Sequence, residues 1–310
     1  MKKVVITGGA GFIGSHLAEE LAKQARQVVI IDDLSTGRRQ NIDALLKKGN
    51  VEFIHASITN LQLLLELFQG SDHVFHQAAI TSVPRSLENP LASHEVNITG
   101  TLNVLLAARD NSVKKVIYAS SCSVYGDTLT LPVTEDMPPN PQSPYAVTKL
   151  AGEYYCRVFH EVYGLPTVCL RYFNIYGSRQ DANSQYAAVI PRFISRALRG
   201  EPPIIYGDGE QTRDFTFVKD TVEASILFAE NNTTGVFNIG SGDSITINKL
   251  ARLITNIMER DVEPIHQEPR PGDIRHSLAD ISSAKAFGYE PKHSLEHGLR
   301  ETIRSFRRKI

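Results

Sequence analysis

The chain has 310 residues, of which 42% are hydrophobic and 22% are charged, an ordinary composition for one large globular domain or two smaller ones. Its 33 lysines and arginines balance 34 aspartates and glutamates, which gives a formal net charge of −1. This balance argues against nucleic acid or an anionic membrane as a partner, so an anionic ligand must meet local positive charge.

Short apolar runs alternate with helical patterns through the first half of the chain, which is the rhythm of a parallel sheet. Strands are expected at residues 3–7, 27–31, 51–55, 73–76, 115–120 and 167–171. Helices are expected at residues 12–23, 61–68, 91–111 and 144–163, long enough to serve as right-handed crossovers. The sheet should therefore be covered on both faces.

Glycine and proline punctuate the sequence more densely after residue 171. A smaller, mixed α/β region is expected there, with helices at 187–199, 219–230, 247–258 and 295–307 and short strands such as 236–239. The apolar runs are only strand-sized, and Met1 leads directly into a strand pattern without a signal peptide. We therefore expect a cytoplasmic protein that does not enter a membrane.

The cysteines and histidines do not follow the spacing of a metal site. Cys122, Cys156 and Cys169 are far apart, without a Cys-x-x-Cys motif. His73 and His76 lie in a strand pattern, where positions i and i+3 face opposite ways. We expect no metal site and no disulfide framework.

A glycine-rich loop separates the first expected strand from the first expected helix. Residues 7–14 read TGGAGFIG, and the spacing of Gly8, Gly11 and Gly14 lets the backbone turn tightly and approach a pyrophosphate. Amide groups at the helix start, at Phe12 and Ile13, would point at the phosphates. The alternative is a tight turn with close helix packing.

Asp32 and Asp33 end the second expected strand, about where a carboxylate can hydrogen-bond the adenosine ribose hydroxyls of a dinucleotide. This favours NAD over NADP, because the carboxylate would repel a 2′-phosphate, although Arg38 and Arg39 follow closely. Asp33 could instead cap the next turn.

Tyr145 and Lys149 are four residues apart, so their side chains meet on one helix face. A free tyrosine has a pKa of about 10, and a neighbouring cation favours the phenolate. We therefore expect Lys149 to lower the pKa of Tyr145 and make it a usable base. Taken alone, the spacing also fits a surface pair that contributes only a few tenths of a kcal/mol.

Several motifs occur in order along the chain: TGGAGFIG at 7–14, FHQAA at 75–79, SSCSVYG at 120–126, YAVTK at 145–149, RYFNIYG at 171–177 and RPGDIRHSLAD at 270–280. Together they resemble the extended short-chain dehydrogenase/reductases, and more narrowly the nucleotide-sugar 4-epimerases, nearly end to end. The resemblance implies an α/β fold: a Rossmann doubly wound parallel sheet that binds NAD at residues 1–175. A smaller mixed α/β lobe that binds a UDP-sugar would occupy residues 176–310, and the chain could cross back between the two. Homodimers are common in the family and would here use the helices at 91–111 and 144–163.

The resemblance also assigns catalytic roles. Tyr145 would be the general base, Lys149 would tune it and bind the nicotinamide ribose, and Ser121 would bridge Tyr145 to the sugar. A serine hydroxyl can donate and accept at once, so it can relay a proton while the nicotinamide takes hydride from the same carbon. Ser123 could make the sugar contact instead, or both serines could cap the end of the fifth strand.

The family pattern places further residues at the cofactor. Near the adenine the family often has an aspartate, whereas residues 56–58 here read Ala-Ser-Ile. Asn97 could equally be a buried amide that satisfies loop backbone. The cofactor residues implied are Gly8, Gly11, Phe12, Ile13, Gly14, Asp32, Ser57, Ile58, Ala78, Ala79, Asn97, Tyr145, Lys149 and Tyr172.

The substrate residues implied by the resemblance come mostly from the second half. Arg213 and Arg270 would bind the diphosphate, since planar guanidinium groups suit that geometry, although both could form surface ion pairs instead. Asp273 would lie near the uridine, or only form a turn with the Pro-Gly before it. The set is Ser82, Ser121, Ser123, Tyr145, Asn174, Val189, Tyr206, Arg213, Arg270, Asp273 and Ser277.

The residues after Ser121 separate related reactions. Dehydratases of this superfamily resemble T-D-E-V-Y-G, and UDP-glucuronate decarboxylases resemble a pattern with Glu at the position of Ser123. Cys122 and Ser123 are not carboxylic acids, so elimination lacks its usual proton donor and acceptor. An epimerase needs only a base, a hydride acceptor and room for a 4-keto intermediate to turn over.

Ser277 matches a position where a bulky tyrosine in glucose/galactose-only relatives leaves no room for a 2-acetamido group. We therefore predict interconversion of UDP-GlcNAc and UDP-GalNAc, with UDP-Glc and UDP-Gal as a second pair. Ser277 could also merely pack at a strand end. Separately from Ser277, the alternative functions are epimerisation of UDP-glucuronate, another modification of a UDP-sugar by a dehydratase or decarboxylase, and NAD binding without catalysis.

Overall fold

The structure is a computed structural model that describes residues 1–128, 130–181, 187–269 and 274–308. Its centre is a seven-stranded sheet in the order β11-β6-β5-β4-β1-β2-β3, and every neighbouring pair in it is parallel. The strands are β1 (Lys3–Thr7), β2 (Gln27–Asp32), β3 (Val51–His55), β4 (His73–His76), β5 (Lys115–Ser121), β6 (Thr167–Tyr172) and β11 (Gly235–Ile239). The predicted doubly wound fold is confirmed, and the strand order reverses between β1 and β4, where such sheets bind ligands.

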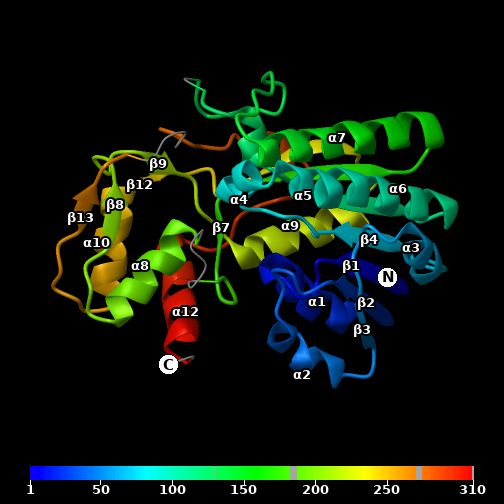
Figure 1. The fold of residues 1–310 in the computed structure, drawn as a ribbon, viewed down its shortest axis with the longest axis horizontal. Coiled ribbons are helices and arrows are strands. Elements are labelled where there is room, and N and C mark those ends of the chain that lie inside the picture. Colours follow the sequence, from blue (N-terminus) through cyan, green and yellow to red (C-terminus); the bar gives the residue numbers. More distant parts are fainter. Residues whose placement is uncertain (129, 182–186, 270–273, 309–310) are drawn as a thin grey trace.

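Helices cover both faces of this sheet, as predicted (Figure 1). On one face α1 (Phe12–Gln24) packs beside α9 (Val218–Glu230), and on the other α3 (Leu61–Leu67), α6 (Gly100–Asp110) and α7 (Pro144–Tyr163) lie together. Each face buries its own apolar core. The shorter helices in this part of the protein are η1 (Arg39–Asn41), α2 (Asp43–Leu46), α4 (Val83–Glu88), η3 (Cys122–Tyr125) and α11 (Ser282–Ala286).

The single helix expected at residues 91–111 is divided. It consists of α5 (Pro90–His94), a π-helical turn η2 (Glu95–Thr99) and then α6. The buried side chain of Asn97 lies in this turn and is bonded to Ile80 and Thr148, on two other segments. The wide turn therefore reflects tertiary contacts that apolar periodicity does not show.

A second lobe adjoins the carboxyl ends of the strands. It contains α8 (Val189–Leu198), α10 (Ile247–Ile257) and α12 (Leu295–Arg307) around a separate apolar core. Three two-stranded sheets frame it: β7 (Ile175–Tyr176) with β10 (Thr216–Phe217), β8 (Ile204–Tyr206) with β13 (Ile265–Gln267), and β9 (Thr212–Arg213) with β12 (Ile245–Thr246). Among the described residues, no helix is long and apolar enough to cross a membrane.

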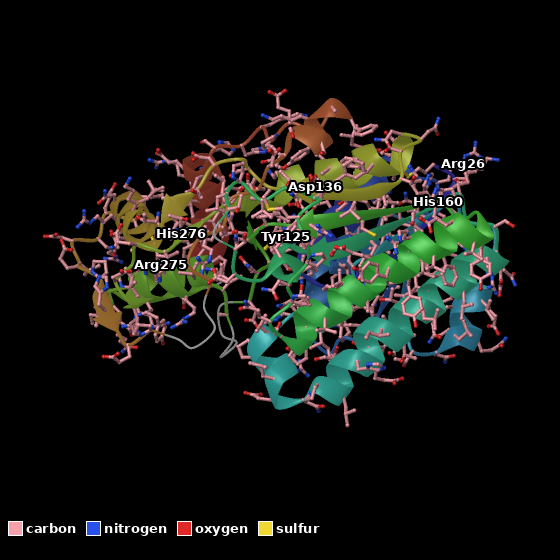
Figure 2. All side chains as sticks on the ribbon, turned by 90° about the horizontal axis from the view of Figure 1, so that it is seen from above. Arg26, Tyr125, Asp136, His160, Arg275 and His276 are labelled. Carbon is pink, nitrogen blue, oxygen red and sulfur yellow. The ribbon has the colours of Figure 1, made fainter. Side chains whose placement is uncertain are left out.

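The chain returns from this lobe to the sheet. We expected the strand at 236–239 in the smaller region, but β11 pairs with β6 at the edge of the main sheet. Figure 2 shows how the strands run through the molecule. Arg26, just before β2, lies at one end with His160; Tyr125, just after β5, lies near the middle; and Arg275 and His276 lie in the second lobe. The carboxyl ends of the strands therefore face the second lobe.

Candidate active site

Close backbone contacts in the loop after β1 require glycine at two of its positions. Gly8 has φ +70°, and a Cβ there would lie 2.6 Å from the Ala78 nitrogen. A Cβ at Gly14 would overlap the Gly8 carbonyl oxygen, whereas one at Gly11 would lie 3.1 Å from that oxygen. Gly8 and Gly14 therefore serve the turn and its packing, while Gly11 is the least crowded of the three. No side chain caps the start of α1, so its first amide groups remain available to a ligand.

Asp32 lies at the end of β2 and is buried against this loop. Its carboxylate accepts hydrogen bonds from the amides of Ala10 at 2.9 Å and Leu34 at 2.8 Å. Burial raises the pKa of Asp32, and these amide hydrogen bonds oppose the rise. The sequence therefore places one buried acid at the β1–β2 edge of the crevice, joined to the glycine loop.

The basic residues after β2 have acidic partners. Arg38 pairs with Asp181 at 2.9 Å, and Arg39 pairs with Asp43 at 3.4 Å. Asp33 accepts the Ser35 amide at 2.9 Å, which is a turn-capping contact.

Ser57 and Ile58 follow β3 at the same edge of the sheet. The Ser57 hydroxyl accepts from the Thr59 hydroxyl at 2.9 Å. Ile58 is buried over Gly100, where any Cβ would meet the isoleucine side chain at 2.5 Å.

Ala78 and Ala79 follow β4, and the buried amide of Asn97 holds the next residue. Asn97 Oδ1 accepts the Ile80 amide at 2.8 Å, and its Nδ2 donates to the Ile80 carbonyl at 3.0 Å and to Thr148 Oγ1 at 3.0 Å. The amide of Asn97 therefore satisfies the loop backbone at Ile80.

Tyr145 and Ser121 come together at the carboxyl end of β5. The Tyr145 ring is buried, and the neighbouring Ser121 side chain lowers the pKa of its phenol. Ser123 donates to the Ser121 hydroxyl at 2.9 Å through its own hydroxyl, and its amide does so at 3.2 Å. Ser121 therefore caps the turn after β5, whereas Ser123 only donates to it.

The expected lowering of the Tyr145 pKa by Lys149 is not what the structure shows. Burial raises the pKa of Tyr145 to about 12, although the Ser121 side chain lowers it. Lys149 Nζ donates instead to the Ala119 carbonyl at 2.8 Å and lies 6.0 Å from the centroid of the Tyr145 ring. Burial lowers the pKa of Lys149 to about 8. Helical spacing brings the two residues to one face but does not aim the ammonium at the phenol oxygen.

A buried ion pair fixes this helix one turn beyond Lys149. The Glu153 carboxylate accepts two hydrogen bonds from the Arg171 guanidinium, at 2.9 Å and 2.7 Å, and another from the Ser120 hydroxyl. Tyr172, the next residue of β6, lies beside Ser121 in register, and its hydroxyl is 2.9 Å from that of Ser225.

A cavity of about 290 Å³ opens in the second lobe. Four predicted substrate residues line it: Asn174, Val189, Tyr206 and Arg213. Asn174 also lies near the turn after β5, because its backbone N–H lowers the pKa of the Cys122 thiol. The cavity therefore adjoins the segment that carries Ser121 and Ser123.

Sequence reasoning missed several residues of this cavity. Arg192 on α8 donates to the Tyr206 hydroxyl at 3.2 Å, and Gln211 and Phe215 also line the wall. An arginine in an amphipathic helix has no local signal that separates a cavity wall from a solvated face.

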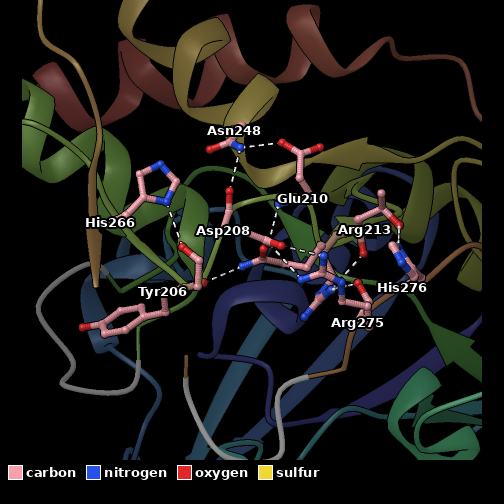
Figure 3. Close-up of polar contacts among 11 residues, drawn as sticks. Tyr206, Asp208, Glu210, Arg213, Asn248, His266, Arg275 and His276 are labelled. Carbon is pink, nitrogen blue, oxygen red and sulfur yellow. Dashed lines mark hydrogen bonds and ion pairs between the residues drawn. The ribbon is translucent and has the colours of Figure 1, made fainter. Parts of the chain in front are cut away.

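Arg213 lies within a polar network that joins two segments of this lobe (Figure 3). Its Nη1 donates to the Thr212 carbonyl at 2.8 Å and to the Arg275 carbonyl at 3.4 Å. Arg275 in turn forms a two-pronged ion pair with Asp208, at 2.9 Å and 2.7 Å. These contacts hold the backbone near Arg213 in place.

The remaining predicted substrate residues have different positions. Ser277 is buried, and its amide donates to the Thr212 carbonyl at 3.1 Å, but it is not part of the cavity wall. Ser82 caps α4 by accepting the Arg85 amide at 3.2 Å. Arg270 and Asp273 lie outside the described residues. The described residues contain no cluster of three or more metal-ligand side chains.

Three features define the class of dinucleotide-binding α/β proteins. They are a parallel sheet whose strand order reverses at its centre, a glycine loop before a helix without a side-chain cap, and a buried acid at the end of the second strand. The sequence matches the NAD dependent epimerase/dehydratase family over residues 4–240, and the chain belongs to that family. The predicted resemblance and the predicted enzyme class are thereby confirmed.

Individual relatives are similar along nearly their whole length. UDP-N-acetylglucosamine 4-epimerase from Methanobrevibacter ruminantium M1, solved in complex with UDP-N-acetylmuramic acid, is 45% identical with a TM-score of 0.97, over 100% of this chain and 99% of that chain. UDP-N-acetyl-alpha-D-glucosaminuronate decarboxylase of Bacillus cytotoxicus is 39% identical over 99% of this chain and 98% of its own. UDP-glucose 4-epimerase of Mycolicibacterium smegmatis is 38% identical over 99% of both chains.

Proposed function

We propose that this protein is a UDP-sugar 4-epimerase that works with bound NAD, and that UDP-GlcNAc and UDP-GalNAc are its principal substrates. The observation that carries the proposal is the approach of the Ser121 side chain to the Tyr145 phenol at the end of β5, beside a cavity whose wall residue Asn174 lies near Cys122 in the turn that follows. A base and a relay hydroxyl are thereby set next to a space that can hold a ligand.

The residues along the crevice fit NAD. The uncapped start of α1 and the open backbone at Gly11 suit a pyrophosphate, and Asp32 suits a ribose diol. Because Arg38 and Arg39 are in ion pairs and Asp32 is acidic, the crevice favours NAD over NADP. Ser57, Ile58, Ala78 and Tyr172 follow or end neighbouring strands at the same edge and belong to this proposed site.

Tyr145 removes the proton from the sugar 4-hydroxyl, directly or through Ser121, and later returns it. NAD, held by the glycine loop and Asp32, would supply the hydride acceptor and, in its oxidised form, a positively charged ring. Because burial raises the pKa of Tyr145 even with Lys149 nearby, we infer that the phenolate forms only once further positive charge is added at the site. Lys149 keeps its own proton below about pH 8.

The turn after β5 disfavours elimination and decarboxylation at this site. Burial raises the pKa of the Cys122 thiol to about 11, so it is a poor acid or base at neutral pH. The Ser123 hydroxyl is engaged with Ser121 and has no carboxylate chemistry. This distinction matters because the B. cytotoxicus relative is a decarboxylase.

In the second lobe, we propose that Arg213 binds the diphosphate and that Tyr206, Val189 and Asn174 contact the rest of the nucleotide sugar. A guanidinium that is already held by neighbouring carbonyls needs little ordering to meet a phosphate. Arg270 and Asp273 remain part of the proposed site on the motif alone. The acetylated pair is proposed from the motif position of Ser277, where glucose/galactose-only relatives have a bulky tyrosine, and from the similarity to a UDP-N-acetylglucosamine 4-epimerase.

We also propose a homodimer through α7 and its neighbours. Exposed apolar side chains occur along α7 at Val147, Tyr154, Val158 and Val162, and on its packed neighbours α4 and α5 at Leu87 and Leu91. Leu91 is 81% exposed and Val162 is 67% exposed, and exposed apolar side chains gathered on neighbouring helices favour a protein partner. Light scattering should give twice the chain mass, and Leu91→Glu with Val158→Glu should reduce it to one chain.

A product assay tests the proposed reaction. The purified protein with bound NAD is incubated separately with UDP-GlcNAc, UDP-GalNAc, UDP-Glc and UDP-glucuronate, and the products are identified by NMR. We expect the 4-epimers of the acetylated sugars. Ser277→Tyr should slow the acetylated pair and spare UDP-Glc, with Ser277→Ala as the size-matched control. Loss of carbon dioxide or water from any substrate, or no conversion of any of them, would overturn the assignment.

A further inference from the structure

A buried histidine lies between the cofactor loops, and the proposed catalysis does not use it. His76 ends β4 and pairs in register with Thr7, the last residue of β1. Its side chain is buried, with Nδ1 2.7 Å from Thr7 Oγ1 and Nε2 2.9 Å from Thr101 Oγ1 on α6. The imidazole therefore joins the central strands to the helix that follows the π-helical turn.

The neighbouring hydrogen bonds determine which ring nitrogen carries the proton. Thr101 Oγ1 donates its own proton to the Asn97 carbonyl at 2.6 Å, so it can only accept from His76. Thr7 Oγ1 accepts the Ala78 amide at 3.3 Å, and its proton is then directed to His76 Nδ1. A neutral imidazole with its proton on Nε2 satisfies both neighbours.

The chain of hydrogen bonds continues from Asn97 into the catalytic helix. Asn97 Nδ2 donates to Thr148 Oγ1 at 3.0 Å, and that hydroxyl donates to the Tyr145 carbonyl at 2.8 Å. Polar contacts thus run from Ala78, beside the glycine loop, to the backbone of Tyr145. Burial and the nearby charge of Lys149 lower the pKa of His76 to about 3, so the ring remains neutral while the helix beside it carries a cation.

We propose that His76 is a positioning residue that, as the Nε2–H tautomer, sets the first turn of α7 relative to the dinucleotide loop. It acts through the Thr101–Asn97–Thr148 contacts and does not touch the reacting atoms. The expected effect of His76 on turnover rests on the proposed function, whereas its expected effect on NAD affinity does not depend on which sugar is epimerised. Misplacement of a reacting group by about 1 Å can cost on the order of a hundredfold in rate, so such a residue can matter without contacting substrate.

A mutant cycle tests this coupling. Thr7→Val and Thr101→Val each remove a hydroxyl at nearly constant volume, one on each side of the imidazole. The two are made singly and together, in the wild type and in His76→Phe, and NAD affinity and kcat are measured. We expect non-additive effects in the wild type and additive effects in His76→Phe. His76→Gln, which keeps one donor and one acceptor, should recover about tenfold of the turnover lost in His76→Phe.

Additive effects in the wild type would overturn the proposal. NAD affinity is measured without any sugar, so it remains informative even if none of the tested sugars is epimerised. Should the His76 variants fail to fold, ¹⁵N NMR of the histidine-labelled wild type still decides. A signal from Nε2–H that is constant between about pH 5 and 8 is expected, whereas protonation at Nδ1 would contradict the hydrogen-bond chain.

Discussion

The two halves of the candidate site are built in different ways. On the sheet side, residues lie at the ends of parallel strands: Gly8 after β1, Asp32 on β2 and Ser121 on β5. On the lobe side, the cavity draws Asn174, Tyr206 and Arg213 from loops and from short strands that form two-stranded sheets with segments distant in the sequence. A parallel sheet collects its carboxyl ends at one edge whatever the loops do, whereas the cavity exists only after distant segments have packed. Cofactor binding and catalysis should therefore be separable from substrate binding by mutation.

The largest effect should come from the phenol on the sheet side. Tyr145→Phe removes the ionisable oxygen and keeps the ring, so turnover should fall about 10²- to 10⁴-fold while NAD stays bound. Steady-state kinetics and the nucleotide content of the purified protein measure the two quantities. Tyr163→Phe, at the exposed far end of the same helix, is the matched control and should keep normal turnover. Equal activity of the two variants would remove Tyr145 from the mechanism.

The glycine loop should separate folding from cofactor binding. Gly14→Ala introduces a Cβ against the Gly8 carbonyl and should lower the free energy of unfolding by about 1–3 kcal/mol or more. Gly11→Val starts from a less crowded position and should mainly weaken NAD binding, by obstructing the ligand side of the loop. Thermal melts and NAD titrations distinguish them. Normal NAD affinity in Gly11→Val would contradict the proposed role of the loop.

A change on the lobe side should leave the cofactor untouched. Arg213→Ala should raise KM about ten- to a hundredfold, because a charge-assisted hydrogen bond contributes about 1.5–3 kcal/mol, with NAD content unchanged. Arg213→Lys keeps the charge but loses the planar fork of the guanidinium, so its KM should lie between those of the wild type and of Arg213→Ala. A loss of NAD in Arg213→Ala would show that the halves are not separable.

The smallest change is spectroscopic. In protein stripped of nucleotide, burial holds the pKa of Tyr145 at about 12, so its phenolate should form only as the pH rises toward that value. Lys149 should lose its proton first, near pH 8. Addition of oxidised NAD should move phenolate formation to lower pH, read as the ultraviolet difference between wild type and Tyr145→Phe. A phenolate at neutral pH without nucleotide would contradict this order of titration.

Sequence patterns predicted the sheet side closely because its signals are local. The strands at 3–7, 51–55 and 73–76 and the helix at 144–163 have the expected bounds, since apolar runs and caps specify them within a few residues. The π-helical turn at Asn97 was not foreseeable, because it depends on Ile80 and Thr148.

Two other features required the tertiary structure. The direction of the pKa shift of Tyr145 was wrong because helical spacing does not reveal that Lys149 donates to Ala119. The strand at 236–239 was placed in the smaller region because its partner, β6, lies more than sixty residues earlier in the chain. Arg192 was missed for a related reason, since only packing turns it toward Tyr206.

The most direct test of the account follows the hydrogen at C4 of the sugar. UDP-GlcNAc carrying deuterium at C4 is incubated with the NAD-bound protein, and the product is examined by NMR and mass spectrometry. If Tyr145 moves only the hydroxyl proton and the hydride returns to the carbon it left, UDP-GalNAc should form with its deuterium retained at C4. Exchange of that deuterium with solvent, or formation of the product by the Tyr145→Phe variant at the wild-type rate, would contradict the mechanism.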